Sequence, residues 1–93
     1  MGVKAARVLI SGRVQGVFFR HWAREQAQGL GVGGWVRNCY GGGVEGHFEG
    51  PEAAVDALIA ACRDGPPLAV VETLEVKPAE FSGAAGFVVR PSA

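Results

Sequence analysis

One stretch of the chain, Gly12–Arg20, holds residue types that could bind an anion. Its glycines at positions 12 and 16 allow the backbone to turn sharply and to approach a ligand without a Cβ in the way. Successive N–H groups of such a turn, followed by the unpaired N–H groups that begin a helix, attract an oxyanion. The planar guanidinium of Arg20 can bind two phosphate oxygens at once. The stretch matches neither glycine pattern of the common nucleotide-binding loops, so a tight turn with a solvated arginine is the alternative.

The flanking residues predict a strand before this stretch and a helix after it. Polar and apolar residues alternate over residues 5–11, which is typical of a half-buried strand. After the stretch, a helix is expected over residues 20–29, with one apolar face formed by Phe19, Ala23, Ala27 and Leu30. Strands are expected over residues 35–39, 44–49, 68–76 and 87–90. A second helix is expected after Pro51, with a stripe formed by Val55, Leu58, Ile59 and Cys62.

This order of elements predicts one domain over residues 1–93 with an α+β, ferredoxin-like βαββαβ fold. In that α/β sandwich two helices cover one face of a 4–5-stranded antiparallel sheet, and the first and third strands are central. The second strand then runs in the direction of the first. Asn38, at the end of the second strand, is therefore expected at the sheet edge that carries the Gly12–Arg20 loop.

Composition and charge limit the function classes. A hydrophobic fraction of 48% is enough for one small core. Net charge is zero, yet residues 1–38 carry six cations and one carboxylate, whereas residues 39–93 carry three cations and eight carboxylates. The basic half contains the predicted anion site. Cys39 and Cys62 lack the spacing of a metal site and are interpreted as packing or surface residues. With no leader or membrane-spanning run, we expect a cytoplasmic monomer without a membrane partner.

Two segments together carry a family resemblance. Gly12-Arg-Val-Gln-Gly-Val-Phe-Phe-Arg20 and Gly34-Trp-Val-Arg-Asn38, with Glu49-Gly50-Pro51 and Gly65-Pro66-Pro67 in register behind them, closely resemble the acylphosphatase family. The resemblance extends from residue 8 to residue 90. It implies a small hydrolase that splits acyl phosphates, which are carboxyl-phosphate anhydrides, into carboxylate and inorganic phosphate. It also implies that no metal and no cofactor are needed.

The resemblance also implies which residues form the site. Arg20 is expected to bind the phosphoryl group together with loop N–H groups, and Asn38 is expected to orient the attacking water. The loop residues so implied are Gln15, Gly16, Val17, Phe18, Phe19 and Arg20. Inorganic phosphate is the expected product and inhibitor. The chain departs from the family where Ala23 replaces a common threonine and where Gly41-Gly42 replaces Asp-Gly, and these changes put fine positioning in doubt.

The chemistry agrees with these residue types. Carboxylate is a good leaving group, so the protein mainly has to stabilise charge on the phosphoryl oxygens and hold a water in line. Residues 1–44 contain a single carboxylate, Glu25, so they offer neither a magnesium cluster nor an obvious acidic base. We therefore expect a phosphate oxygen of the substrate to take the proton of the water. The alternative is a non-catalytic phosphate-binding regulatory module of the same fold.

The remaining candidates have simpler interpretations. A nucleic-acid partner is not expected, because the first and third strands place no aromatic pair on the open face of the sheet. His21 is expected to point to solvent, and His47 to lie on the solvated face of its strand. Gln15 either supports the loop or does not; the sequence leaves this open. We expect Trp22, Trp35 and Phe18 to be packing residues, although one of them could shape an acyl pocket. We expect the side chains of Arg13 and Arg37 to be solvated.

Overall fold

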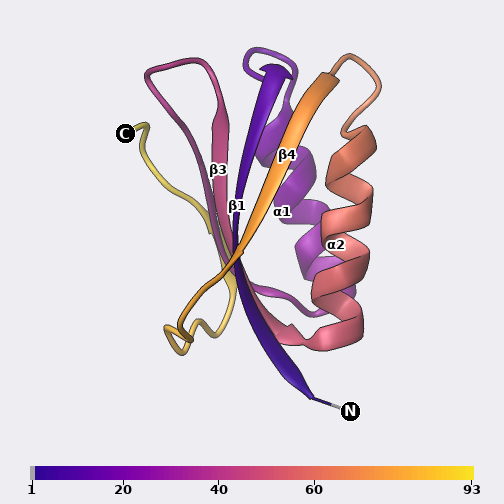
Figure 1. Ribbon diagram of the computed structural model, residues 1–93, viewed down its shortest axis with the longest axis vertical. Helices are drawn as coiled ribbons and strands as arrows, with labels where there is room; N and C mark the ends of the chain where they lie inside the picture. The colour runs from indigo at the N-terminus through magenta and orange to yellow at the C-terminus, as the bar shows by residue number, and fades with distance from the viewer. Residues whose placement is uncertain (1) are drawn as a thin grey trace.

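The computed structural model describes residues 2–93. In chain order the elements are β1 (Val3–Arg13), α1 (Phe19–Leu30), β2 (Gly33–Asn38), β3 (Val44–Pro51), α2 (Glu52–Asp64), β4 (Val70–Pro78) and β5 (Phe87–Val89). The five strands form one sheet in the order β4-β1-β3-β2-β5. Both helices cover the same face of this sheet (Figure 1). The predicted ferredoxin-like fold is therefore confirmed, with β1 and β3 in the central part of the sheet.

The sheet is mixed, where an antiparallel one was predicted. β1 pairs antiparallel with β3 and with β4, and β2 pairs antiparallel with β3. β5, however, pairs parallel with β2. The reason is where the chain crosses: β4 is the opposite edge strand, and it ends at the end of the sheet at which β2 begins (Figure 1). After residues 79–86 have crossed there, β5 can only run in the direction of β2.

The core lies between the helices and the sheet. The predicted stripe of α2 is buried in full, and Phe19, Ala23 and Ala27 bury the corresponding face of α1. Leu30 was expected on that face, but 38% of it is exposed. It is the last residue of α1, and the left-handed Gly31 turns the chain away directly after it. Cys62 is a core residue, and its burial raises the pKa of its thiol to about 12.

The alternation of residues in β3 predicts a solvated polar face, but the structure buries His47 and Glu49 on that face. His47 is only 2% exposed and Glu49 only 5% exposed. The segment that crosses from β4 to β5 covers Glu49, whose carboxylate accepts hydrogen bonds from Ser82 N–H, the Ser82 hydroxyl and Ala84 N–H. The His47 imidazole is hydrogen-bonded to the same carboxylate. Alternation identifies two faces of a strand, but it does not show what covers the second one.

The open face of the sheet carries one aromatic cluster. Trp35 stacks on His47, with ring centroids 6.3 Å apart. Three guanidinium groups lie 4.7–4.9 Å from the Trp35 ring, those of Arg7, Arg37 and Arg90. Arg37 is also bound to Glu45, at 2.7 and 2.9 Å, so the solvated role expected of Arg37 is wrong. Trp35 packs on this face, away from the helices.

Candidate active site

The loop between β1 and α1 is shorter than the sequence indicated. β1 continues through Gly12 and Arg13, where an irregularity in its pairing with β4 follows Ser11. A Cβ on Gly12 would lie 2.2 Å from the main-chain oxygen of Val70. Gly12 is thus required by the close approach of β4, and it does not line the pocket at the start of α1. The loop itself comprises residues 14–18.

Within this loop, two residues adopt left-handed backbone conformations. Gly16 has φ 72°, and a Cβ there would meet nothing within 4 Å. Phe18 has φ 62° and is the residue before the first turn of α1, while 77% of it is exposed. A left-handed conformation is unfavourable for a bulky residue, and such strain gathers at functional sites. The loop is fixed by neighbouring side chains that are buried in the core: Val14, Val17 and Phe19.

These turns leave main-chain N–H groups free at the start of α1. The first hydrogen bond of the helix runs from Trp22 N–H to the main-chain oxygen of Phe18, at 2.9 Å. The N–H groups of Phe19, Arg20 and His21 therefore find no acceptor inside the helix. No side chain caps this end, and its first turn contains no acidic residue. Such a terminus combines free donors with a positive dipole end, and an anion is the ligand that suits both.

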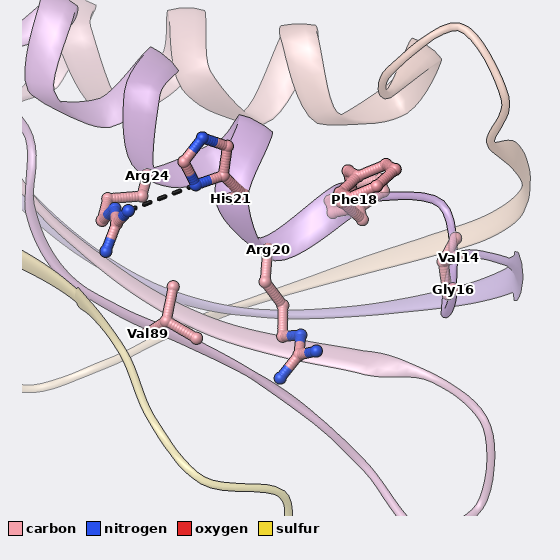
Figure 2. Close-up of a pocket in the computed structure, with 8 residues that line it drawn as sticks. Val14, Gly16, Phe18, Arg20, His21, Arg24 and Val89 are labelled. Carbon is pink, nitrogen blue, oxygen red and sulfur yellow. Dashed lines mark hydrogen bonds between the residues drawn. The ribbon is translucent and has the colours of Figure 1, made fainter.

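An open pocket of about 500 Å³ lies at this helix end (Figure 2). It is lined by Val14, Gly16, Phe18, Phe19, Arg20, His21, Arg24 and Val89. Of the predicted site residues, four line it, while Gln15, Val17 and Asn38 do not. Trp22 and Trp35 do not line it either. Trp22 packs on Phe19, with ring centroids 5.4 Å apart.

The sequence had not singled out Arg24 or Val89 as site residues. Arg24 follows Arg20 by four positions, so helical spacing alone places both on one face of α1. Val89 comes from β5, and no local pattern could have indicated it, because its position depends on the crossing of residues 79–86 to the edge beside β2.

Gln15 joins the loop to the β2–β3 hairpin. Its side-chain N–H₂ group donates to the main-chain oxygens of Cys39, at 2.7 Å, and Gly43, at 2.8 Å. The question that the sequence left open is thereby answered: Gln15 supports the loop. The hairpin turn that it holds is closed by hydrogen bonds from Gly42 N–H to Cys39 O and from Cys39 N–H to Gly43 O.

Asn38 is the last residue of β2 and lies at the same end of the sheet as the loop. In the sheet register it pairs with Val44, which pairs on its other side with Ile10 near the end of β1. Its main-chain oxygen accepts a hydrogen bond of 3.0 Å from Ala93 N–H. Its side-chain Oδ1 atom is buried and has no hydrogen-bond partner among residues 2–93. A buried acceptor without a donor is costly, which is typical of a functional atom.

The cations of the pocket are not neutralised by the protein. Among residues 2–93, neither Arg20 nor Arg24 has a carboxylate oxygen within 4.0 Å. His21 is exposed as predicted: it accepts a hydrogen bond from Arg24 and lies 3.5 Å from a carboxylate oxygen of Glu25. Over the same residues there is no group of three or more metal-ligating side chains. No helix of the described chain is long and apolar enough to cross a membrane.

Comparison with known proteins places this site in a family. The acylphosphatase family model matches residues 6–89. An acylphosphatase of Rhodospirillum rubrum is 52% identical over 97% of this chain and 99% of its own length, and one of Rubrobacter xylanophilus is 57% identical over 94% and 80%. The crystal structure of Bacillus subtilis acylphosphatase is similar with a TM-score of 0.90, 32% identity, and coverage of 96% of this chain and 99% of that one. The chain therefore belongs to the acylphosphatase family, whose members are enzymes that hydrolyse acyl phosphates.

Proposed function

We propose that the pocket at the start of α1 is where this enzyme hydrolyses the carboxyl-phosphate bond of an acyl phosphate. One observation carries the proposal: Arg20, which has no carboxylate partner among residues 2–93, shares a pocket with the unpaired N–H groups of a helix terminus. Arg20 contributes two or more donors in a plane, and the N–H groups of the loop and of the first helical turn contribute donors from the other side. Together they fit the three terminal oxygens of a phosphoryl group.

Catalysis in this arrangement comes from charge stabilisation. As the bond between phosphorus and the acyl oxygen breaks, the phosphoryl oxygens are held by donors that are already in place and need no reorganisation. The acyl group leaves as a carboxylate, which needs no proton. The side-chain amide of Asn38 orients the attacking water by accepting one of its hydrogens at Oδ1. That atom is buried and has no other hydrogen-bond partner among the described residues, which supports this role.

The proton balance closes without a protein base. The oxygen of the water forms a bond to phosphorus, the bond to the carboxylate oxygen breaks, and the proton of the water passes to a phosphoryl oxygen of the substrate. None of the eight residues that line the pocket is a carboxylic acid. The products are a carboxylate and inorganic phosphate, which competes for the same donors. In this mechanism neither a metal nor a cofactor takes part.

Localisation and assembly are also proposals. The described chain has two free cysteines, Cys39 and Cys62. Free thiols persist in a reducing compartment, so we place the enzyme in the cytoplasm. We expect it to act as a monomer, because the pocket is formed by elements of a single chain. Size-exclusion chromatography of the active enzyme tests this point, and a catalytically competent dimer with no active monomer would contradict it.

The function itself is tested by the hydrolysis of benzoyl phosphate with and without a chelator. Turnover that the chelator does not change, and that inorganic phosphate slows competitively, is the expected result. Loss of turnover on chelation would overturn the metal-free mechanism. Folded protein that binds phosphate but shows no turnover would instead indicate the regulatory anion-binding module.

A further inference from the structure

The pocket contains a second arginine that the proposed hydrolysis does not use. Arg24 lies one helical turn after Arg20 and lines the same pocket. Its Nη2 atom is 3.2 Å from Nδ1 of His21, to which the guanidinium donates. Figure 2 shows this contact, with Val89 between the two arginine side chains. Arg24 is thus held at the wall of the pocket by an imidazole nitrogen.

The placement of Arg24 is unfavourable without an anionic ligand. Like charges four residues apart on a helix repel each other, and cations near the start of a helix oppose its dipole. Arg20, in the first turn of α1, incurs both costs, and Arg24, one turn later, incurs the repulsion. The nearest acid on that helix, Glu25, lies beside His21 and is 63% exposed at its side chain. It makes no ion pair with either arginine within the described chain.

The pocket is larger than a phosphoryl group requires. Its volume of about 500 Å³ falls in the range of sites for whole small molecules. The part that does not donate hydrogen bonds is apolar and is formed by Val14, Phe18, Phe19 and Val89. An acyl group bound over Val89 would extend from the phosphoryl site at Arg20 toward Arg24. The far end of that acyl group would then meet a second cation.

We infer that Arg24 is a specificity residue that selects acyl phosphates whose acyl group carries a second anionic group, such as a carboxylate. This inference rests on the proposed function of the same pocket. It assigns the phosphoryl group to Arg20 and the free N–H groups, and the distal carboxylate to Arg24. The pocket is open and Arg24 is half-buried, so Arg24 and the distal carboxylate would form a partly solvated ion pair. Such a pair should raise kcat/KM about five-fold over that of a matched substrate without the distal charge.

Matched substrates test the inference. 4-Carboxybenzoyl phosphate and 4-carbamoylbenzoyl phosphate have nearly the same shape, but only the first carries a distal charge. The carboxamide withdraws electrons more strongly than the ionised carboxylate, so each rate must be corrected for intrinsic reactivity. The 3-substituted pair places the charge at a second position. The measured quantity is the ratio of kcat/KM for the carboxylate over that for the amide, each divided by its uncatalysed rate. Unsubstituted benzoyl phosphate reports on hydrolysis itself.

We expect the wild-type enzyme to favour the carboxylate of at least one pair by about five-fold. The ratio should fall to about one in Arg24→Gln, partly recover in Arg24→Lys, and decline with added salt. The control is Arg63→Gln, since Arg63 is an exposed arginine in the last turn of α2 and outside the pocket; it should keep the wild-type ratio.

Two results would overturn the inference. The first is turnover of benzoyl phosphate with no preference for either carboxylate. The second is a preference that persists in Arg24→Gln. Both leave the proposed function intact. Absence of turnover with every substrate would overturn the proposed function, and the inference with it.

Discussion

The side-chain amide of Gln15 donates to the main-chain oxygens of Cys39 and Gly43, so the loop that begins the pocket is bound directly to the residue that follows Asn38. The two segments are 24 residues apart in the chain. One amide thereby fixes the β1–α1 loop, with its free N–H groups, against the hairpin that carries the proposed water-orienting residue. Figure 1 shows the two turns at the same end of the sheet.

Gln15→Ala should therefore impair catalysis more than folding. The substitution removes two hydrogen bonds, but each carbonyl keeps a main-chain donor from the hairpin turn. The unfolding free energy should fall by about 1–2 kcal/mol, and kcat by about ten-fold as the loop and Asn38 lose their relative position. Urea denaturation and benzoyl phosphate kinetics measure the two effects. Gln28→Ala, at an exposed position on α1, serves as the control; an unchanged kcat in Gln15→Ala would contradict the positioning role.

Arg20→Lys should reduce kcat/KM by about 10²–10³-fold and weaken inhibition by inorganic phosphate. A lysine keeps the charge but cannot span two oxygens with a planar pair of donors. Far-UV circular dichroism should be unchanged, because Arg20 makes no ion pair with the rest of the described chain. The matched control is Arg63→Lys on α2. Near-normal turnover in Arg20→Lys would mean that the site needs only a positive charge at this position, and not a planar group that binds two phosphoryl oxygens.

Asn38→Ala should separate activity from stability. The variant loses the atom proposed to orient water, so kcat should fall by about 10²-fold or more while phosphate inhibition stays close to normal. The unfolding free energy should not decrease, since the substitution also removes a buried acceptor that lacks a donor. Asn38→Asp keeps the shape but adds a negative charge, so it should weaken phosphate binding as well. Full activity in Asn38→Ala is the result that would remove Asn38 from the mechanism.

Glu49 should make stability depend on pH in the acid range. Burial raises the pKa of its carboxyl, but hydrogen bonds from Ser82 N–H, His47, Ala84 N–H and the Ser82 hydroxyl together lower that pKa to about 2, from an ordinary value of 4.5. Because the folded-state pKa is the lower one, this stabilisation is present above about pH 4.5 and is lost as the pH falls toward 2. The hydrogen bonds involved are those that tie Glu49 to the segment that leads into β5 and so to Val89 of the pocket.

Glu49→Gln should lower the unfolding free energy at neutral pH by about 1–3 kcal/mol, because a charged acceptor becomes a neutral one. It should also flatten the decline of stability between pH 5 and pH 2 relative to the wild type. Urea denaturation across this pH range measures both. The control is Glu80→Gln, since Glu80 is an exposed glutamate within the same crossing segment. An equally steep acid decline in Glu49→Gln would show that other carboxylates produce it.

The sequence by itself determined the order of the elements and the direction of β2 relative to β1, and it predicted an anion site in the first loop. These follow from local causes: apolar spacing, glycines that end helices or turn the chain, and an arginine at a helix start. Arg20 and Asn38 could be chosen because the two family segments occur at their expected separation. Their catalytic roles stay predictions until the variants are measured.

Only the tertiary structure decided which residues that are far apart in the sequence come into contact. The crossing of residues 79–86 buried Glu49, turned β5 parallel to β2, and brought Val89 into the pocket. None of this is encoded by a local period, because alternation along β3 is the same whether or not another segment covers its polar face. The contact of Gln15 with the hairpin likewise exists only once β1, β3 and β2 are paired in register. Local chemistry therefore specified the donors of the site, and strand pairing decided which of them meet in one pocket.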